Sequence, residues 1–183
     1  MKAYDFLDSQ ARLQPNAEFA VDAEKRITYS EARDTVNRIA RAMIACRLAP
    51  GDRVAILMRN RIETVLIFFA AFKAGLVATP INYRLTPTDW QKVCEDAGAK
   101  LLFSEAEFVP SIDAVRGRLE SVDRFIVVAG SGPGWQNFAA WAVGESGDVA
   151  NAPVAENDDA LLMYTSGTTA QPKSVVLTHH AVL

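Results

Sequence analysis

The sequence predicts an α/β fold with a mainly parallel sheet and helices on both of its faces. Short runs rich in apolar and β-branched residues alternate with longer runs of helical periodicity. The predicted strands are almost wholly apolar, as in a sheet that is buried on both faces. With 183 residues, the chain can bury one sizeable core or two small ones.

A first helix is predicted by apolar residues at three- and four-residue steps from Ala32 to Met43. It should begin at Ser30, and the Pro-Gly-Asp sequence at 50–52 should terminate it. The run RVAILM at 53–58 follows as the first predicted strand.

A second helix should begin at Asn60, because Asn60 and Glu63 have the spacing of a capping box. This helix carries the apolar run VLIFFAAF and should be almost wholly buried. Gly75 ends it, and residues 76–81 are predicted to form the next strand.

A third helix opens with Thr86 as N-cap and Pro87 at the first helical position, where its missing N–H costs nothing. Its buried face should comprise Trp90, Val93, Cys94 and Ala97. A strand at 100–103 follows.

The remaining elements are predicted in the same way. Apolar residues at helical spacing from Phe108 to Leu119 suggest a helix, and 124–128 suggest a strand. Residues 129–159 are rich in Gly, Pro, Ser and acidic residues, which indicates an irregular connection with room for one short helix, where Trp135 and Trp141 pack locally.

Two further strands are predicted at 160–164 and 174–177. Thr178 then resembles the N-cap of another helix, of which the sequence includes about one turn. We therefore expect these residues to be part of a longer protein.

Composition excludes several classes of function. The net charge of −3 and the absence of a basic cluster argue against nucleic-acid binding. Two cysteines, Cys46 and Cys94, without zinc-site spacing favour reduced core thiols and no metal site. The longest apolar run, at 65–72, is far short of the ~18 residues that span a bilayer. With Asp5 and Asp8 interrupting any signal peptide, we expect a cytoplasmic protein.

The segment TSGTTAQPK, from Thr165 to Lys173, stands between two predicted buried strands. Its glycine allows close approach of the backbone, its hydroxyls donate hydrogen bonds, and its lysine supplies a compact positive charge. This combination suits a polyphosphate. Without further information, a flexible hairpin turn is an equally good interpretation.

A Walker P-loop is the nearest general pattern, but it fits poorly. Pro172 replaces the second glycine and has no N–H to donate to a phosphate. The segment after Lys173 is predicted to be a strand, whereas a P-loop continues into a helix.

The stretch from Tyr164 to Val175, YTSGTTAQPKSV, resembles the signature of the AMP-forming adenylating enzymes, the superfamily that includes the acyl-CoA synthetases. The upstream segments ITYSEARDTVNRIARAM, GDRVAILMRN and FFAAFKAGLVATPINYRLT are similar to the family's N-terminal region and occur in its order. By this resemblance, residues 1–183 form the N-terminal α/β part of an AMP-binding domain, with the connection at about 129–159 and the phosphate loop at 165–174.

The resemblance implies an acid:CoA ligase of fatty or aryl acid metabolism. Such an enzyme joins a carboxylic acid to ATP, releases pyrophosphate and passes the acyl group to coenzyme A. The residues implied to bind the β- and γ-phosphates, with Mg²⁺ arriving on ATP, are Thr165, Ser166, Gly167, Thr168, Thr169 and Lys173. The family's adenine contacts, acyl pocket, acidic Mg²⁺ contact and C-terminal domain with its catalytic lysine would lie after Leu183. No catalytic residue is therefore assigned here, and the 183 residues alone are expected to be inactive.

Two positions depart from the family pattern, because Ala170 and Ser174 stand where glycine is common. If the backbone at either position requires a positive φ, a residue other than glycine would cost roughly 1 kcal/mol or more. Ser174 is expected to be tolerated less well than Ala170.

Other interpretations remain open. The chain could be a truncated, non-catalytic nucleotide-binding or interaction module, which would be monomeric, whereas part of a larger domain should expose apolar surface and self-associate. His179 and His180 are expected to be solvated in a first helical turn, and Arg84 to lie at the surface or in an ion pair.

Overall fold

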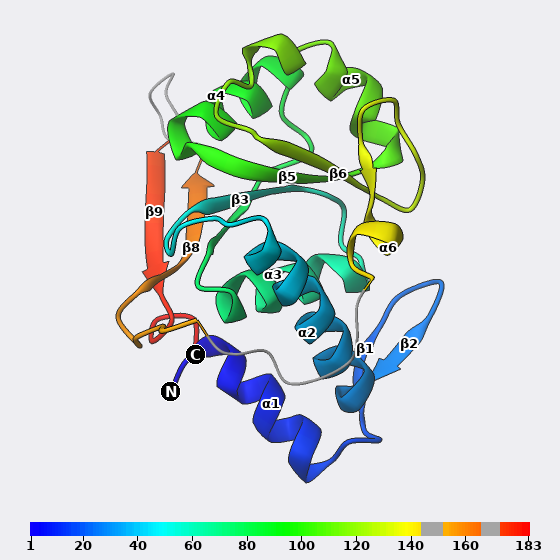
Figure 1. Ribbon diagram of the computed structural model, residues 1–183, viewed down its shortest axis with the longest axis vertical. Helices are drawn as coiled ribbons and strands as arrows, with labels where there is room; N and C mark the ends of the chain where they lie inside the picture. Colours follow the sequence, from blue (N-terminus) through cyan, green and yellow to red (C-terminus); the bar gives the residue numbers. More distant parts are fainter. Residues whose placement is uncertain (144–151, 166–172) are drawn as a thin grey trace.

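The computed structural model describes residues 1–143, 152–165 and 173–183. A seven-stranded sheet forms its centre, and residues 18–28 form a separate two-stranded hairpin (Figure 1). The helices are α1 (Ala3–Leu13), α2 (Tyr29–Ala45), α3 (Ile62–Lys73), α4 (Pro87–Ala97), α5 (Val109–Asp113) and α6 (Phe138–Trp141). The strands are β1 (Glu18–Val21), β2 (Arg26–Thr28), β3 (Arg53–Leu57), β4 (Val77–Pro80), β5 (Ala99–Glu105), β6 (Arg124–Val128), β7 (Gln136–Asn137), β8 (Asp159–Thr165) and β9 (Lys173–Thr178).

The sheet has the order β7-β6-β5-β3-β4-β8-β9. All neighbouring strands in it are parallel except β8 and β9, which form an antiparallel pair at one edge. From β3 the chain first adds β4 on one side and then crosses to add β5 on the other. The prediction of a mainly parallel α/β sheet is confirmed.

Two hydrophobic cores lie on opposite faces of this sheet. Helices α1, α2 and α3 cover one face, and α4 and α5 cover the other (Figure 1). Strands β3 and β5 send alternate side chains into each core, so that Ile56 enters one and Leu57 the other. This two-sided burial explains why their sequences are continuously apolar.

The predicted start of α2 was wrong by one residue. Thr28 is the N-cap, and its hydroxyl accepts a hydrogen bond from the backbone N–H of Glu31, whose carboxylate accepts one from the N–H of Thr28. The helix ends at Ala45, before the Pro-Gly-Asp sequence.

The predicted capping box at Asn60 is also wrong. Arg61 is the N-cap of α3 and its side chain makes no capping bond. The N–H of Ile62 instead donates to the Asp22 carboxylate at 3.2 Å, from the loop that joins β1 to β2. A residue forty positions earlier therefore caps this helix.

The predicted start of α4 is confirmed. Thr86 caps the helix by accepting from the N–H of Asp89, and Pro87 is its first residue. The four residues predicted for its inner face, Trp90, Val93, Cys94 and Ala97, are all buried.

The continuous helix predicted from Phe108 to Leu119 is replaced by α5 and two 3₁₀ turns, Ala106–Phe108 and Arg116–Arg118. Pro110 lies in the first turn of α5, where its ring starts a helix but cannot continue one, and Gly117 weakens the helix beyond it. The apolar positions are buried as predicted.

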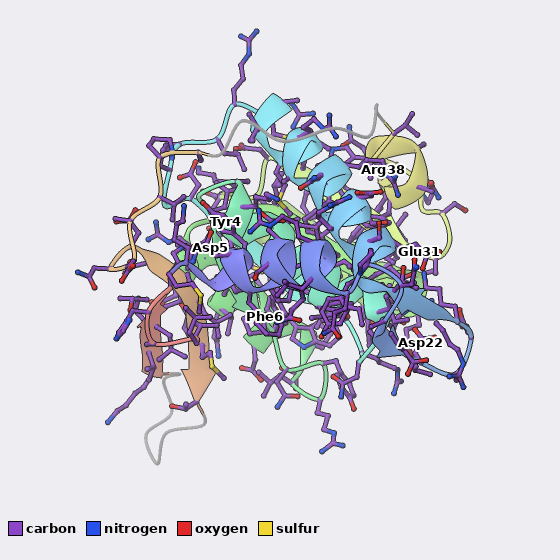
Figure 2. All side chains as sticks on the ribbon, turned by 90° about the horizontal axis from the view of Figure 1, so that it is seen from below. Tyr4, Asp5, Phe6, Asp22, Glu31 and Arg38 are labelled. Carbon is purple, nitrogen blue, oxygen red and sulfur yellow. The ribbon has the colours of Figure 1, made fainter. Side chains whose placement is uncertain are left out.

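Sequence analysis did not identify α1. Figure 2 looks onto α1 from below, with Tyr4 near its N-terminal end and Asp22 beyond its C-terminal end. A buried lysine of α3, Lys73, fixes α1 by donating to the Asp8 carboxylate at 2.8 Å and to the Asn37 side chain of α2 at 2.7 Å. Three helices are thus joined at one ammonium group.

The two cysteines differ in burial. Cys94 is buried, whereas Cys46 is only half-buried, and neither forms a disulfide. In the described ranges, no helix has both the length and the apolar character needed to cross a bilayer.

Candidate functional site: the β8–β9 hairpin

Strands β8 and β9 bring the two ends of the predicted phosphate loop together. In their antiparallel ladder, Asp159 pairs with Thr178 at one end and Thr165 with Lys173 at the other. The Thr165 hydroxyl approaches the Lys173 carbonyl oxygen at 3.4 Å. The side chains of Thr165 and Lys173 are exposed. Of the predicted phosphate-binding residues, Ser166, Gly167, Thr168 and Thr169 lie outside the described ranges, as does Ala170.

The strand that begins at Lys173 is inconsistent with a Walker P-loop, which continues into a helix. Residues Lys173–Thr178 form β9, and Ser174 pairs with Tyr164 in its ladder. Only Arg47 and Ala129 among the described non-glycine residues have positive φ. The expected strain at Ser174 is therefore wrong, because an extended strand accepts serine as readily as glycine.

Tyr164, the residue before Thr165, connects the hairpin to α4. Its hydroxyl donates a hydrogen bond of 2.6 Å to the Asp96 carboxylate. Burial first, and then this bond to Asp96, raise the pKa of Tyr164 above its usual value. The tyrosine therefore remains a neutral hydrogen-bond donor at physiological pH.

A second group of polar residues lies where the strand order reverses, at the carboxyl ends of β3 and β5. In parallel sheets this position is a common binding crevice. Here Arg59 forms two hydrogen bonds with Glu107, of 2.6 and 2.9 Å, and its guanidinium lies 5.1 Å from the Tyr83 ring centroid. Glu105 accepts from the backbone N–H of Arg59. Sequence analysis missed this group, because its partners are 46 to 48 residues apart.

Arg59 forms an ion pair with Glu107, and Arg61 lies 3.8 Å from Glu105. These charges are already paired, so the group is a weaker candidate site than the hairpin. The described ranges contain no group of three His, Cys, Asp or Glu side chains that could hold a metal ion. Arg84 is exposed beside the same tyrosine, with its guanidinium 5.7 Å from the Tyr83 ring, as expected for a surface residue.

The expectation for His179 was wrong. Residues 179–182 form a turn instead of a helix, and His179 is 1% exposed, between the rings of Tyr4 and Phe72. Burial holds its pKa below the usual 6.5. It lines a cavity of about 360 Å³ with Pro50, Gly75 and Asp158. His180 is exposed as expected.

Comparison with known proteins identifies the family. Residues 7–183 match the family model described as AMP-binding enzyme. The chain is 36% identical over 174 residues to the long-chain-fatty-acid–CoA ligase FadD13 of Mycobacterium tuberculosis, covering 93% of this chain and 33% of that protein. It is also 36% identical over 167 residues to the 3-hydroxybenzoate–CoA ligase of Aromatoleum sp., covering 89% of this chain and 31% of that protein.

Solved structures agree. The anthranilate CoA ligase AuaEII in complex with anthranoyl-AMP superposes with a TM-score of 0.93 at 26% identity, over 98% of this chain and 35% of that one. The N-terminal domain of FACL13 from Mycobacterium tuberculosis superposes with a TM-score of 0.87 at 33% identity, over 98% of this chain and 45% of that one.

The chain spans about a third of the length of the curated relatives it matches. The match nevertheless includes all seven strands of the sheet and both ends of the candidate loop. The chain therefore belongs to the family of AMP-binding enzymes.

Proposed function

We propose that these residues supply the phosphate site of an AMP-forming acid:CoA ligase. The observation that carries the proposal is the pairing of Thr165 with Lys173 at the loop end of the β8–β9 hairpin, where residues 166–172 connect the two strands. This pairing presents a hydroxyl and an ammonium group at the two ends of a segment rich in small hydrogen-bond donors. Membership of the AMP-binding family and the acid–CoA ligases among its relatives support the same conclusion.

In the proposed reaction, a carboxylate oxygen of the acid substrate attacks the α-phosphorus of ATP. The bond from that phosphorus to the bridging oxygen breaks, and pyrophosphate leaves with the electron pair. The thiol of coenzyme A then attacks the acyl carbon and releases AMP. Because the substrate's own carboxylate is the nucleophile, the protein needs mainly to align the reactants and stabilise negative charge.

Thr165 and Lys173 would act on the pyrophosphate side of this reaction. The hydroxyl of Thr165 can donate to a phosphate oxygen, and the ammonium of Lys173 can neutralise charge on the terminal phosphates. Together with Ser166, Gly167, Thr168 and Thr169 they form the proposed phosphate-binding set. Mg²⁺ would enter with ATP, held by the phosphate oxygens as is usual for this ion.

Calorimetric titration with MgATP tests the phosphate site. We expect Lys173→Ala to weaken MgATP binding by roughly ten- to a hundredfold, since a charge-assisted contact contributes ~1.5–3 kcal/mol. Lys92→Ala, at an exposed lysine of α4, is the matched control and should bind as the unaltered chain does. Equal affinity of the Lys173→Ala and Lys92→Ala variants would contradict the assignment.

Exchange of pyrophosphate into ATP tests the ligase chemistry. The 183 residues alone are expected to bind MgATP without carboxylate-dependent exchange, whereas a protein that also carries the remaining two thirds of the relatives' length should exchange. Fatty and hydroxybenzoic acids are suitable first substrates, because relatives of this chain are named for both. Absence of exchange with every acid in the longer protein would favour a non-catalytic nucleotide-binding module.

A further inference from the structure

We propose that the hydrogen bond between Tyr164 and Asp96 is a positioning contact for the phosphate site. It holds the loop end of the β8–β9 hairpin against α4, so that Thr165 and Lys173 stay in place to receive a polyphosphate. The inference rests on the proposed function and adds two residues to it, neither of which touches the nucleotide.

The loop end of the hairpin has few other contacts that hold it in place. Strand β4, which joins β8 to the sheet, forms one registered pair with it among the described residues, Ala78 with Leu161. Strand β4 ends at Pro80, which has no N–H to extend the ladder toward Thr165. On the other side lies β9, the edge strand, with Val175 and Val176 almost half exposed. Backbone pairing with the rest of the sheet therefore ends before the candidate site begins.

Tyr164 attaches this end of the hairpin to α4. Its ring packs against the buried side chains of Val77, Ala97 and Leu162, and its hydroxyl reaches Asp96 on α4, 68 residues earlier in the chain. Figure 1 shows the upper end of β8 beside α4. The contact joins the residue directly before Thr165 to a helix that is anchored in the core.

Helix α4 is a suitable anchor because both of its ends are well capped. Thr86 caps its start, and Gly98 ends it in the left-handed region at φ 61°, directly after Ala97. Asp96 lies in the last turn, next to buried Ala97, so its backbone is held by the core while its carboxylate reaches the surface. A hydrogen bond to this carboxylate should therefore restrict Tyr164 and, through the strand, Thr165.

The test compares Tyr164→Phe with Tyr29→Phe, a matched control on α2 at the opposite face of the sheet. For Tyr164→Phe, amide hydrogen exchange should speed up several-fold at Thr165 and Lys173 but not at Asp159 and Thr178. Affinity for MgATP should fall by up to about fivefold, the factor that corresponds to ~1 kcal/mol of lost ordering, whereas Tyr29→Phe should leave it unchanged. Asp96→Ala should reproduce both effects. Asp96→Asn, whose amide oxygen still accepts the hydrogen bond, should restore most of the affinity.

The outcomes separate the two proposals. If the unaltered chain binds MgATP and Tyr164→Phe binds it equally well, the positioning role is wrong and the phosphate site stands. If Asp96→Asn is as weak as Asp96→Ala, the charge of Asp96 matters and not its hydrogen bond, which also overturns the inference. If the unaltered chain does not bind MgATP, the proposed function fails, and the positioning role fails with it.

Discussion

At the scale of single residues, the main surprise is His179. It follows a threonine in a polar-looking segment, and nothing in the local sequence distinguishes it from the exposed His180. Its burial depends on Tyr4 and Phe72, which arrive from α1 and α3. Thr165 and Lys173 can be proposed as site residues from the sequence alone, because they belong to one contiguous motif. Sequence analysis could not identify His179 or Asp96, whose neighbours are distant in the chain.

The burial of His179 predicts a specific dependence of stability on pH. Its pKa in the folded chain is lower than the usual 6.5, so the unfolded chain binds a proton first as the pH falls. The free energy of unfolding should therefore decrease as the pH falls below about 6.5, until the folded chain also takes up the proton.

Urea unfolding at a series of pH values between 7.5 and 5, a range of roughly one unit on either side of the usual histidine pKa, measures this effect. His179→Gln should flatten the dependence in that window, whereas His180→Gln should leave it unchanged. An identical pH profile in the two variants would show that His179 does not carry the effect.

At the scale of elements, the predictions succeeded where local sequence controls the outcome. Strands β3, β6 and β8 were located from short apolar runs, and α4 from its own threonine cap and proline. The cap of α3 was wrong because it comes from Asp22, in a distant hairpin. Helix α1 could have been predicted from the sequence, since its buried residues Tyr4, Leu7 and Ala11 follow helical spacing.

The cap of α3 gives a prediction at this scale. The Asp22 carboxylate accepts from the backbone N–H groups of Glu24, Lys25 and Ile62, and these bonds lower its pKa. We expect Asp22→Ala to lower the melting temperature by loosening both the hairpin and the start of α3. Asp123→Ala, at an exposed carboxylate before β6, is the control. Equal melting temperatures for the two variants would show that the cap contributes nothing.

At the scale of the whole molecule, the edge of the sheet formed by β9 exposes apolar side chains. Met163, Val175 and Val176 are each at least 40% exposed on the β8–β9 hairpin. An apolar edge strand with free backbone groups favours pairing with another chain. Because the matched relatives are about three times as long, this edge is a candidate for contact with the rest of such an enzyme.

We therefore predict self-association of the 183-residue chain through β9. Its elution volume in size-exclusion chromatography should decrease as the protein concentration rises. Val176→Lys should suppress this change, whereas Val21→Lys, at a similarly exposed valine of β1, should not. A chain that stays monomeric at every concentration would instead favour the non-catalytic module.

We propose above that ATP phosphates bind at the loop end of the β8–β9 hairpin, at Thr165 and Lys173. Titration of an isotopically labelled chain with MgATP, followed by amide NMR shifts, locates the bound nucleotide directly. The largest shifts should occur at Thr165 and Lys173, with little change at Arg59 and Glu107, which follow the carboxyl ends of β3 and β5. Shifts confined to Arg59 and Glu107, or no shifts at saturating MgATP, would contradict it.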